Sequence, residues 1–504
     1  MIESTQLPAL LIVVPILAAT LPLVLGIRYE KAGWSVAMVV TTALFFATSW
    51  IAVLVYGGDG AIVHHLGGFQ PPIGIELVAD RFSTGIAVLV AAVSVATLAY
   101  TRVGGPRGNT FYAGYLLLVG GLMGVTLTGD AFNLFVFLEI TGIATYALVA
   151  RGRGGGAAVA AMKYLILGTL GASLYLIGVG FLYLATGTLN MVHLGESLTA
   201  VGYSDPLVRA GFAFIVIGFA IKVAQWPVHT WQPDAYQRAP DGVTPLIAAL
   251  VSTVSAYALG RVLYVVFTPE FLLETPFASE ILVTIGTASV IAGSVLAVMQ
   301  WNLKRMLAYS SVSQFGLIVA AYGLVTETAL LGAMVHLLGH GLMKAGLFIG
   351  VGIIAATIGV RTIEEYGGLA RSRPYIAGSI VLLGIALVGI PPSIGFIGKW
   401  YIAVGAVEAA MWPIAAVIFF STMLTLAYVA KLGERMYVQK DSGPSHSVRA
   451  TPLLTDGGTM LARPASIGMR LSLIGIALVA ILLGFAGAGF DAAFGPFVDE
   501  VFSP

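Results

Sequence analysis

The sequence predicts an all-α polytopic membrane protein with about fourteen transmembrane helices, and three observations carry this prediction. Hydrophobic residues make up 58% of the 504 residues and charged residues only 10%. The mean hydropathy is +0.95. Because a helix needs about 20 mostly apolar residues to cross a bilayer, a succession of such stretches indicates repeated crossings rather than a soluble core.

The apolar stretches follow one another along the whole chain. They lie near residues 7–26, 33–56, 82–101, 111–129, 131–150, 161–186, 209–229, 243–266, 278–299, 306–323, 328–357, 376–406, 411–430 and 469–490. They divide the chain into an N-terminal three-helix region (1–110), a first five-helix repeat (111–267), a second five-helix repeat (278–430), a linker (431–468) and a C-terminal helix with its tail (469–504).

The positive charges give an independent check on the helix count. With fourteen spans, eighteen of the 25 Lys and Arg residues fall in odd-numbered loops, and only Arg81, Arg209 and Arg261 fall in even-numbered ones. Cytoplasmic loops collect positive charge, so both termini are predicted to be external and the linker cytoplasmic, in a plasma-membrane protein. The Ser-, Gly- and Pro-rich linker predicts a last helix that is only loosely tied to the rest.

Composition also excludes several classes of chemistry. The chain has no cysteine, which removes disulfides, thiolate nucleophiles and the usual iron–sulfur ligands, so no cofactor is expected and redox chemistry would reside on a partner. A net charge of +1 does not favour nucleic acid. His336 and His340 have the i, i+4 spacing of metal ligands, but no third ligand accompanies them, so no metal is expected.

Ionisable residues inside the apolar stretches point to the function. Four lysines, Lys163, Lys222, Lys344 and Lys399, lie at membrane depth, where a charged group is costly and rarely kept without a task. Glu139 lies at a similar depth. His336 and His340 precede Lys344 at i, i+4 and i+8 spacing, so all three occupy one helix face, and histidine titrates nearest neutral pH. Together these groups predict a path for protons.

The fourth to eighth and the ninth to thirteenth helices are predicted to be two inverted repeats, because each set has a charged, proline-interrupted helix in fourth place. Lys222 lies five residues before Pro227, and Pro391 and Pro392 precede Lys399. Five spans per unit, an odd number, turn the second copy upside down, as in many transporters with broken helices. Two unrelated kinked helices are the alternative interpretation.

Four long segments carry a resemblance to a known family. They read KVAQWPVHTWQPDAYQRAPDGVTPL (222–246), LKRMLAYSSVSQFG (303–316), HLLGHGLMKAGLF (336–348) and GIPPSIGFIGKW (389–400). They resemble the signature segments of the antiporter-like proton-translocating subunits found in respiratory complex I, membrane-bound hydrogenases and Mrp-type cation/proton antiporters. The resemblance spans roughly residues 65–430 and implies the same fold and a proton-translocating role.

The resemblance also implies residue roles. Glu139 matches the glutamate that pairs with the lysine of the broken seventh helix, here Lys222, and a static buried pair is the alternative. Lys163 matches a frequent sixth-helix lysine, which is either a relay or a snorkelling anchor. Lys399 matches the terminal proton-exit lysine. Apart from the resemblance, His229, Asp234 and Arg238 follow the broken helix and form either a proton entry or a cap that pins the turn; entry is favoured for His229 and pinning for Asp234.

One departure from the family pattern concerns the eighth helix. Relatives commonly carry a lysine or histidine there to link the two half-channels, whereas this helix offers Ser252, Thr253, Ser255 and Tyr257 before Arg261. Hydroxyl groups can hold a water wire but cannot store a proton near neutral pH. Either water spans the gap, or the coupling differs from the usual scheme.

Three function classes follow, the first of them favoured. The first is a proton-conducting subunit of an Mrp-type sodium (cation)/proton antiporter, similar to the D subunit of such antiporters. The second is the equivalent subunit of a redox-driven complex, an NADH:quinone oxidoreductase or membrane hydrogenase, and the third is a stand-alone transporter. The first two imply other membrane subunits as partners, with protons and Na⁺ as substrates and no enzymatic activity in this chain alone.

Overall fold

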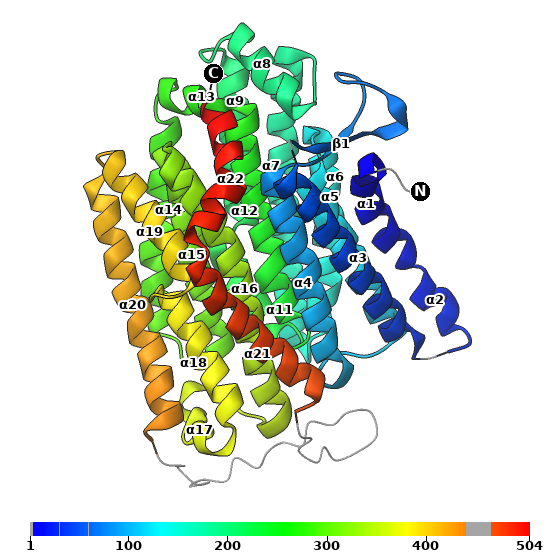
Figure 1. Cartoon of the computed structure of the whole chain (residues 1–504), viewed down its shortest axis with the longest axis vertical. Coiled ribbons are helices and arrows are strands. Elements are labelled where there is room, and N and C mark those ends of the chain that lie inside the picture. Colours follow the sequence, from blue (N-terminus) through cyan, green and yellow to red (C-terminus); the bar gives the residue numbers. More distant parts are fainter. Residues whose placement is uncertain (1–3, 30, 59, 440–464, 504) are drawn as a thin grey trace.

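A computed structural model describes residues 4–29, 31–58, 60–439 and 465–503, and these residues form a bundle of membrane-spanning helices (Figure 1). Twelve helices are long and apolar enough to cross a membrane. Two further predicted spans, the seventh and the twelfth, are broken helices. The chain is therefore a multi-pass membrane protein with the predicted fold class.

The N-terminal region forms three spans and a small hairpin. Its elements are η1 (Ser4–Gln6), α1 (Leu7–Ala18), α2 (Leu21–Gly26), α3 (Ala32–Gly57), β1 (Ile62–His65), η2 (Leu66–Gly68), β2 (Glu76–Ala79) and α4 (Arg81–Gly104). The two strands pair antiparallel, with Ile62 opposite Ala79. The Asp80 carboxylate accepts a hydrogen bond from the backbone N–H of Ser83, and the Ser83 hydroxyl accepts one from the backbone N–H of Asp80. This capping box fixes where the third span begins.

The next five spans correspond to the first predicted repeat. Their elements are α5 (Asn109–Leu127), α6 (Ala131–Ala150), α7 (Gly155–Thr186), α8 (Met191–Val201), α9 (Pro206–Lys222), η3 (Val228–Thr230), α10 (Trp231–Arg238), α11 (Thr244–Leu246), η4 (Ile247–Val251), α12 (Ser252–Arg261) and η5 (Val262–Val266). The continuous helix from Thr244 to Val266 is called the eighth span below. Its η4 and η5 segments are π-helical, a feature that is rare and frequent at functional sites.

The remaining spans correspond to the second predicted repeat and the C-terminal helix. Their elements are α13 (Thr268–Glu274), α14 (Ala278–Val298), α15 (Leu303–Leu324), α16 (Glu327–Ile358), η6 (Ile363–Tyr366), α17 (Leu369–Ser372), α18 (Pro374–Val388), α19 (Ile394–Glu408), α20 (Trp412–Tyr437), α21 (Ile467–Leu482), η7 (Leu483–Phe485) and α22 (Gly487–Phe502). The linker residues 440–464 lie outside the described residues.

The two sets of five spans share one plan. The third helix of each set, α7 or α16, has 32 residues and packs against both halves of the broken helix that follows it. The first break follows Lys222, where Ala224 has a positive φ of 57°. The second follows Val388, where Gly389 has a φ of 89°. Prolines after each turn cannot donate to a helix, so the helices stop where the sequence predicted.

Two expectations about the periphery are wrong. The last helix is not loosely tied, because α21 packs against α4, α16 and α18, and α22 against α4 and α16. In Figure 1 this red pair runs obliquely across the bundle. Ser472 donates to the carbonyl of Ala96, and Gly468 approaches Ala99 closely. Arg261, expected in a loop, is only 6% exposed inside the eighth span.

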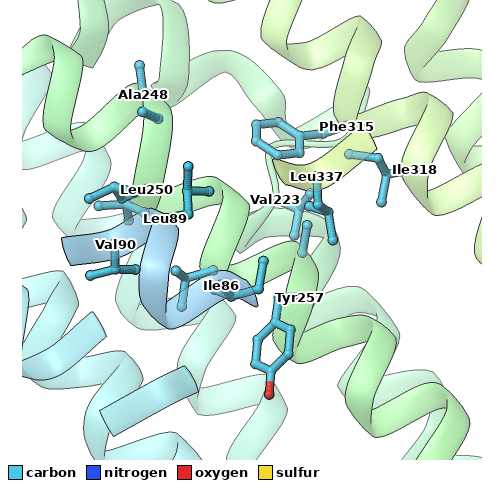
Figure 2. Close-up of a cluster of buried hydrophobic side chains, with 14 of the residues drawn as sticks. Ile86, Leu89, Val90, Val223, Ala248, Leu250, Tyr257, Phe315, Ile318 and Leu337 are labelled. Carbon is cyan, nitrogen blue, oxygen red and sulfur yellow. The ribbon is translucent and has the colours of Figure 1, made fainter. Parts of the chain in front are cut away.

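The centre of the bundle contains an apolar core. All of the most hydrophobic window of the eighth span is buried inside the protein, as is 94% of that of α15. Figure 2 shows side chains from α4, the end of α9, the eighth span, α15 and α16 meeting there, among them Ile86, Leu89, Val90, Val223, Leu250, Phe315, Ile318 and Leu337. Polar groups in this region therefore face one another rather than lipid.

Candidate functional site

The first candidate site is the ion pair between Glu139 and Lys222. Lys222 ends α9 and is 8% exposed, and its Nζ lies 3.4 Å from Oε1 of Glu139 on α6. The C-terminal end of a helix carries unsatisfied carbonyls and a partial negative charge. The structure thus brings the expected pair together at the break, with Lys222 in the last turn of α9 and the Glu139 carboxylate as its hydrogen-bond partner.

The second candidate site is Lys399 at the break between α18 and α19. Its Nζ donates to the carbonyls of Leu387 and Val388, at 3.1 and 2.9 Å. These are terminal carbonyls of α18, so this lysine also binds a helix C-terminus. Gly389 holds the turn, and a Cβ at this residue would lie 3.0 Å from Cδ of Lys399. Glycine is thus favoured at this position for two reasons: it adopts the positive φ without strain, and it leaves room for the side-chain methylenes of Lys399.

The third candidate site is the face of α16 with His336, His340 and Lys344, all fully buried. His336 Nε2 lies 2.9 Å from Oε1 of Gln314. Lys344 donates to the carbonyl of Leu307 at 2.7 Å and to the Ser310 hydroxyl. His340 packs edge-on against the Phe315 ring, and neither of its ring nitrogens has a partner among the described residues. All these partners belong to α15.

The remaining candidates lie at the far side of the first break. Lys163 Nζ binds Oδ2 of Asp234 at 2.8 Å, and Arg305 binds Oδ1 of the same carboxylate at 2.9 Å. Lys163 is about one-third exposed and belongs to a partly exposed charge cluster, so its role as a relay or as an anchor stays a prediction. His229 is 6% exposed, and its ring lies 6.0 Å from that of Tyr309. Asp234 pins α10 to both α7 and α15.

Sequence reasoning missed a buried pair between Asp80 and Arg261. Asp80 is the cap of α4, and its carboxylate accepts from the guanidinium of Arg261. Tyr257, one turn away, donates to the carbonyl of Thr126 and lies within hydrogen-bond distance of Arg261. The signal in the sequence was the arginine within an otherwise apolar span, which requires a partner.

A second missed cluster joins Asp241, Lys304 and Arg361. Asp241 lies in the turn before the eighth span, and its carboxylate binds Lys304 at 3.1 Å and Arg361 at 2.9 Å. Burial alone would raise the pKa of Asp241, but the two cations outweigh it and lower this pKa to about 2. Lys304 also donates to the carbonyl of Ala239. This cluster ties the turn to α15 and to the loop after α16.

The comparisons with known proteins fit this geometry. The family described as "NADH:quinone oxidoreductase/Mrp antiporter, TM" matches residues 128–425, more than half of the chain. The chain belongs to this family. The matched segment contains all eight predicted site residues of this antiporter-like subunit: Glu139, Lys163, Lys222, His229, His336, His340, Lys344 and Lys399.

Curated relatives of the antiporter-like subunit come from two kinds of complex. The N subunit of the NADH-quinone oxidoreductase of Desulforudis audaxviator is 38% identical over 95% of this chain and 96% of its own length. The D subunit of the Na⁺/H⁺ antiporter of Alkalihalophilus pseudofirmus is 31% identical, over 84% of this chain and 86% of its own. Both groups of relatives were expected from the sequence motifs.

Solved structures similar to this chain include a chain of an Mrp complex and a chain of an archaeal respiratory complex. A chain of the Mrp complex from Dietzia sp. DQ12-45-1b superposes with a TM-score of 0.89 at 25% identity, covering 100% of this chain and 98% of that one. A chain of the membrane-bound sulfane sulfur reductase, an archaeal respiratory membrane complex, gives a TM-score of 0.88 at 31% identity, with 98% of each chain covered. The antiporter-like subunit therefore resembles single chains of larger assemblies along its whole length.

Proposed function

We propose that this chain is a proton-translocating subunit of a multisubunit membrane complex. The observation that carries the proposal is the pair of Glu139 and Lys222 at the break after α9. A nearby carboxylate favours the charged lysine and desolvation favours the neutral one, so a small movement of either group shifts the affinity of the lysine for a proton. Protons then pass from this pair toward α16 and leave at Lys399.

Two assemblies are candidates for this subunit, each with its own supporting observation. The sequence analysis favours a cation/proton antiporter, and the TM-score of 0.89 to a chain of an Mrp complex supports that choice. The 38% identity to the N subunit of an NADH-quinone oxidoreductase over nearly the whole chain favours a redox-driven pump. In both candidates the complex lies in the plasma membrane with both termini of this chain outside, and other membrane subunits surround it.

The deciding experiment is purification of this chain from its native membrane in mild detergent, with the partners identified by mass spectrometry. Small membrane partners without iron–sulfur absorbance, and Na⁺-driven proton movement in vesicles, would assign the antiporter. Co-purifying iron–sulfur or flavin subunits would assign the redox-driven pump. A solitary chain that transports a solute by itself would contradict the multisubunit proposal altogether.

The proton role itself is tested in inverted membrane vesicles with a pH-sensitive dye. Proton movement that requires this chain and is lost on removal of the Glu139 carboxylate supports the proposal. Wild-type rates without that carboxylate would refute it, whichever assembly the chain belongs to.

A further inference from the structure

The junction between α10 and the eighth span carries a polar cluster that no predicted site residue belongs to. It consists of Gln232 and Tyr236 on α10 and Ser252 on the eighth span, all at most 1% exposed. A buried polar cluster in a membrane protein is costly unless its groups satisfy one another. It lies beside the eighth span, which has no lysine or histidine to link the two half-channels, so we ask whether the cluster can pass a proton instead.

The three side chains form a closed set of hydrogen bonds. Nε2 of Gln232 donates to the Tyr236 hydroxyl and to the Ser252 hydroxyl, both at 3.1 Å. The two hydroxyl oxygens lie 3.0 Å apart, and either can be the donor. A hydroxyl group has one proton and two acceptor lone pairs, so this pair can accept a proton on one oxygen while releasing one from the other.

The π-helical turn of the eighth span aims Ser252 at α10. Ser252 follows the turn Ile247–Val251 directly, and the Ile247 carbonyl accepts a long hydrogen bond, 3.4 Å, from the Tyr236 hydroxyl. Ser255, one turn later, donates instead to Val251 in its own helix, as serines in helices commonly do. Ser252, which follows the π-helical turn, therefore hydrogen-bonds to α10 and not within its own helix.

One acceptor of the cluster remains open. Oε1 of Gln232 has no hydrogen-bond partner among the described residues, although the side chain is fully buried. Such an atom ordinarily bonds to protein or to an ordered water. A water held there is the natural next acceptor for a proton that leaves the hydroxyl pair, because an amide carbonyl itself is a poor proton carrier.

The cluster lies between the two groups of candidate lysines. On one side, Trp231 donates from Nε1 to the carbonyl of Ile221, the residue before Lys222. On the other side, the Tyr236 ring packs edge-on against Phe348, with centroids 5.9 Å apart. Phe348 is one helical turn from Lys344 on α16. The helix α10, which carries two of the three cluster residues, therefore contacts both the end of α9 and α16.

The neighbouring route is closed. The backbones of α16 and the π-helical turn touch, since a Cβ on Gly341 would lie 2.9 Å from the Ala249 carbonyl oxygen. Figure 2 shows the apolar side chains of Leu89, Leu250 and Leu337 in the adjoining space. Apolar side chains do not carry protons, so this part of the contact between α16 and the eighth span offers no proton path.

We propose that Gln232, Tyr236 and Ser252 form a proton-passing junction between the broken seventh helix and α16, in place of a titrating residue on the eighth span. This inference rests on the proposed function. A proton arriving on the Ser252 oxygen releases the Ser252 proton to Tyr236, whose own proton passes to a water held by Gln232. Only O–H bonds form and break, and one proton enters for each that leaves.

The test uses the intact complex reconstituted into liposomes with an internal pH dye. Tyr236→Phe and Ser252→Val each remove one hydroxyl, and we expect each to slow proton translocation at least about tenfold, less than the roughly hundredfold or more expected for a lost acid–base group. Ser252→Thr has the same shape as Ser252→Val but keeps the hydroxyl, so it should retain most of the rate. Ser255→Ala, which removes a hydroxyl bonded only within its own helix, is the control.

Assembly is followed by the yield of complete complex, and rates are expressed per complex. If Ser252→Val does not assemble, Tyr236→Phe, which removes a single oxygen, decides alone. Wild-type rates in Tyr236→Phe would overturn the junction, as would equal rates in the Thr and Val variants. Glu139→Gln measured in parallel separates the two proposals. If Glu139→Gln is slow while the junction variants are fast, the proton-junction proposal is refuted and the proposed proton-translocating function stands.

Discussion

The two broken helices hold their lysines in different electrostatic settings. Lys222 lies at the end of α9 and faces the Glu139 carboxylate at 3.4 Å. Lys399 reaches the end of α18 from the next helix and, among the described residues, binds only the carbonyls of Leu387 and Val388. Both lysines lie near a helix C-terminus, but among the described residues only the first has an opposite charge as its hydrogen-bond partner.

This difference suggests two ways of controlling a buried proton site. In the first half, the charge on Lys222 responds to the distance from Glu139, because the Coulomb attraction of a buried pair changes steeply with separation. In the second half, the hydrogen-bond partner is the backbone itself, so the affinity of Lys399 for a proton changes when α18 and α19 move relative to each other. The first site is tuned by a side chain and the second by a turn.

The largest expected effect comes from removing the carboxylate of the first half. Glu139→Gln should lower the proton-translocation rate about a hundredfold or more, within the range for a lost acid–base group, while the complex still assembles. The measurement is dye quenching in inverted vesicles. Glu196→Gln, on the exposed side of α8, is the matched control and should be unaffected; a fast Glu139→Gln would mean that the pair is static.

The second prediction concerns the lysine without a counter-charge. Lys399→Leu should abolish translocation because leucine cannot hold a proton. Lys399→Glu should retain part of the rate, since a protonated carboxyl can donate to the same carbonyls of Leu387 and Val388. The same vesicle assay compares both variants at equal amounts of complex. An active leucine variant would show that Lys399 is not in the proton path, and the two broken helices could then no longer be compared as two proton sites.

The third prediction isolates the turn that positions Lys399. Gly389→Ala should slow translocation several-fold, because a Cβ would press on the lysine stem and an L-residue at positive φ costs about 1–2 kcal/mol. Gly187→Ala supplies the control. Gly187 also has a positive φ, 76°, but its Cβ would meet nothing within 4 Å. Equal rates in the two variants would mean that the turn does not position the lysine.

The fourth prediction uses the pair of Asp80 and Arg261 as a static counterpart to Glu139 and Lys222. Asp80→Asn leaves a buried guanidinium unpaired and should cost about 3 kcal/mol of stability, seen as a lower thermal midpoint of the purified complex. The translocation rate per folded complex should stay close to that of the wild type. A rate loss as large as that of Glu139→Gln would place this pair in the proton path as well.

The smallest effect is expected at the Asp241 cluster, outside the membrane spans. The pKa of Asp241 is lowered to about 2 by Lys304 and Arg361, so the ionised carboxylate stabilises the fold above its unfolded pKa of about 3.9, and this contribution is lost as the pH falls toward 2. Asp241→Asn should lower the thermal midpoint by a constant amount from pH 8 to 5. The difference should shrink below about pH 4; a difference unchanged at pH 3 would contradict the ionic explanation.

Much of the site was predictable because its members are conspicuous in an apolar sequence. Glu139, Lys222 and Lys399 stand out at membrane depth, and the prolines mark both breaks. The pairing of Glu139 with Lys222 came from the family resemblance and is confirmed as a contact. The roles of these residues stay predictions until transport is measured.

Other contacts could not be predicted because their partners are far apart in the sequence. Asp80 and Arg261 are separated by 181 residues, and the count of positive charges placed the arginine in a loop. The sequence left Lys163 as a relay or a membrane anchor, and only the structure shows that Asp234 is its partner. A spacing rule finds residues on one helix face, but it carries no information about which distant helix lies opposite.

The sequence by itself determined the spans, the two breaks and the identity of the buried charges, because each depends on local hydropathy and on the missing N–H of proline. Only the tertiary structure decided which acceptor each charge meets: a carboxylate for Lys222 and backbone carbonyls for Lys399. It also decided that Ser252 faces Gln232 and Tyr236. Those choices depend on helix packing, where groups distant in sequence must satisfy one another in the absence of water.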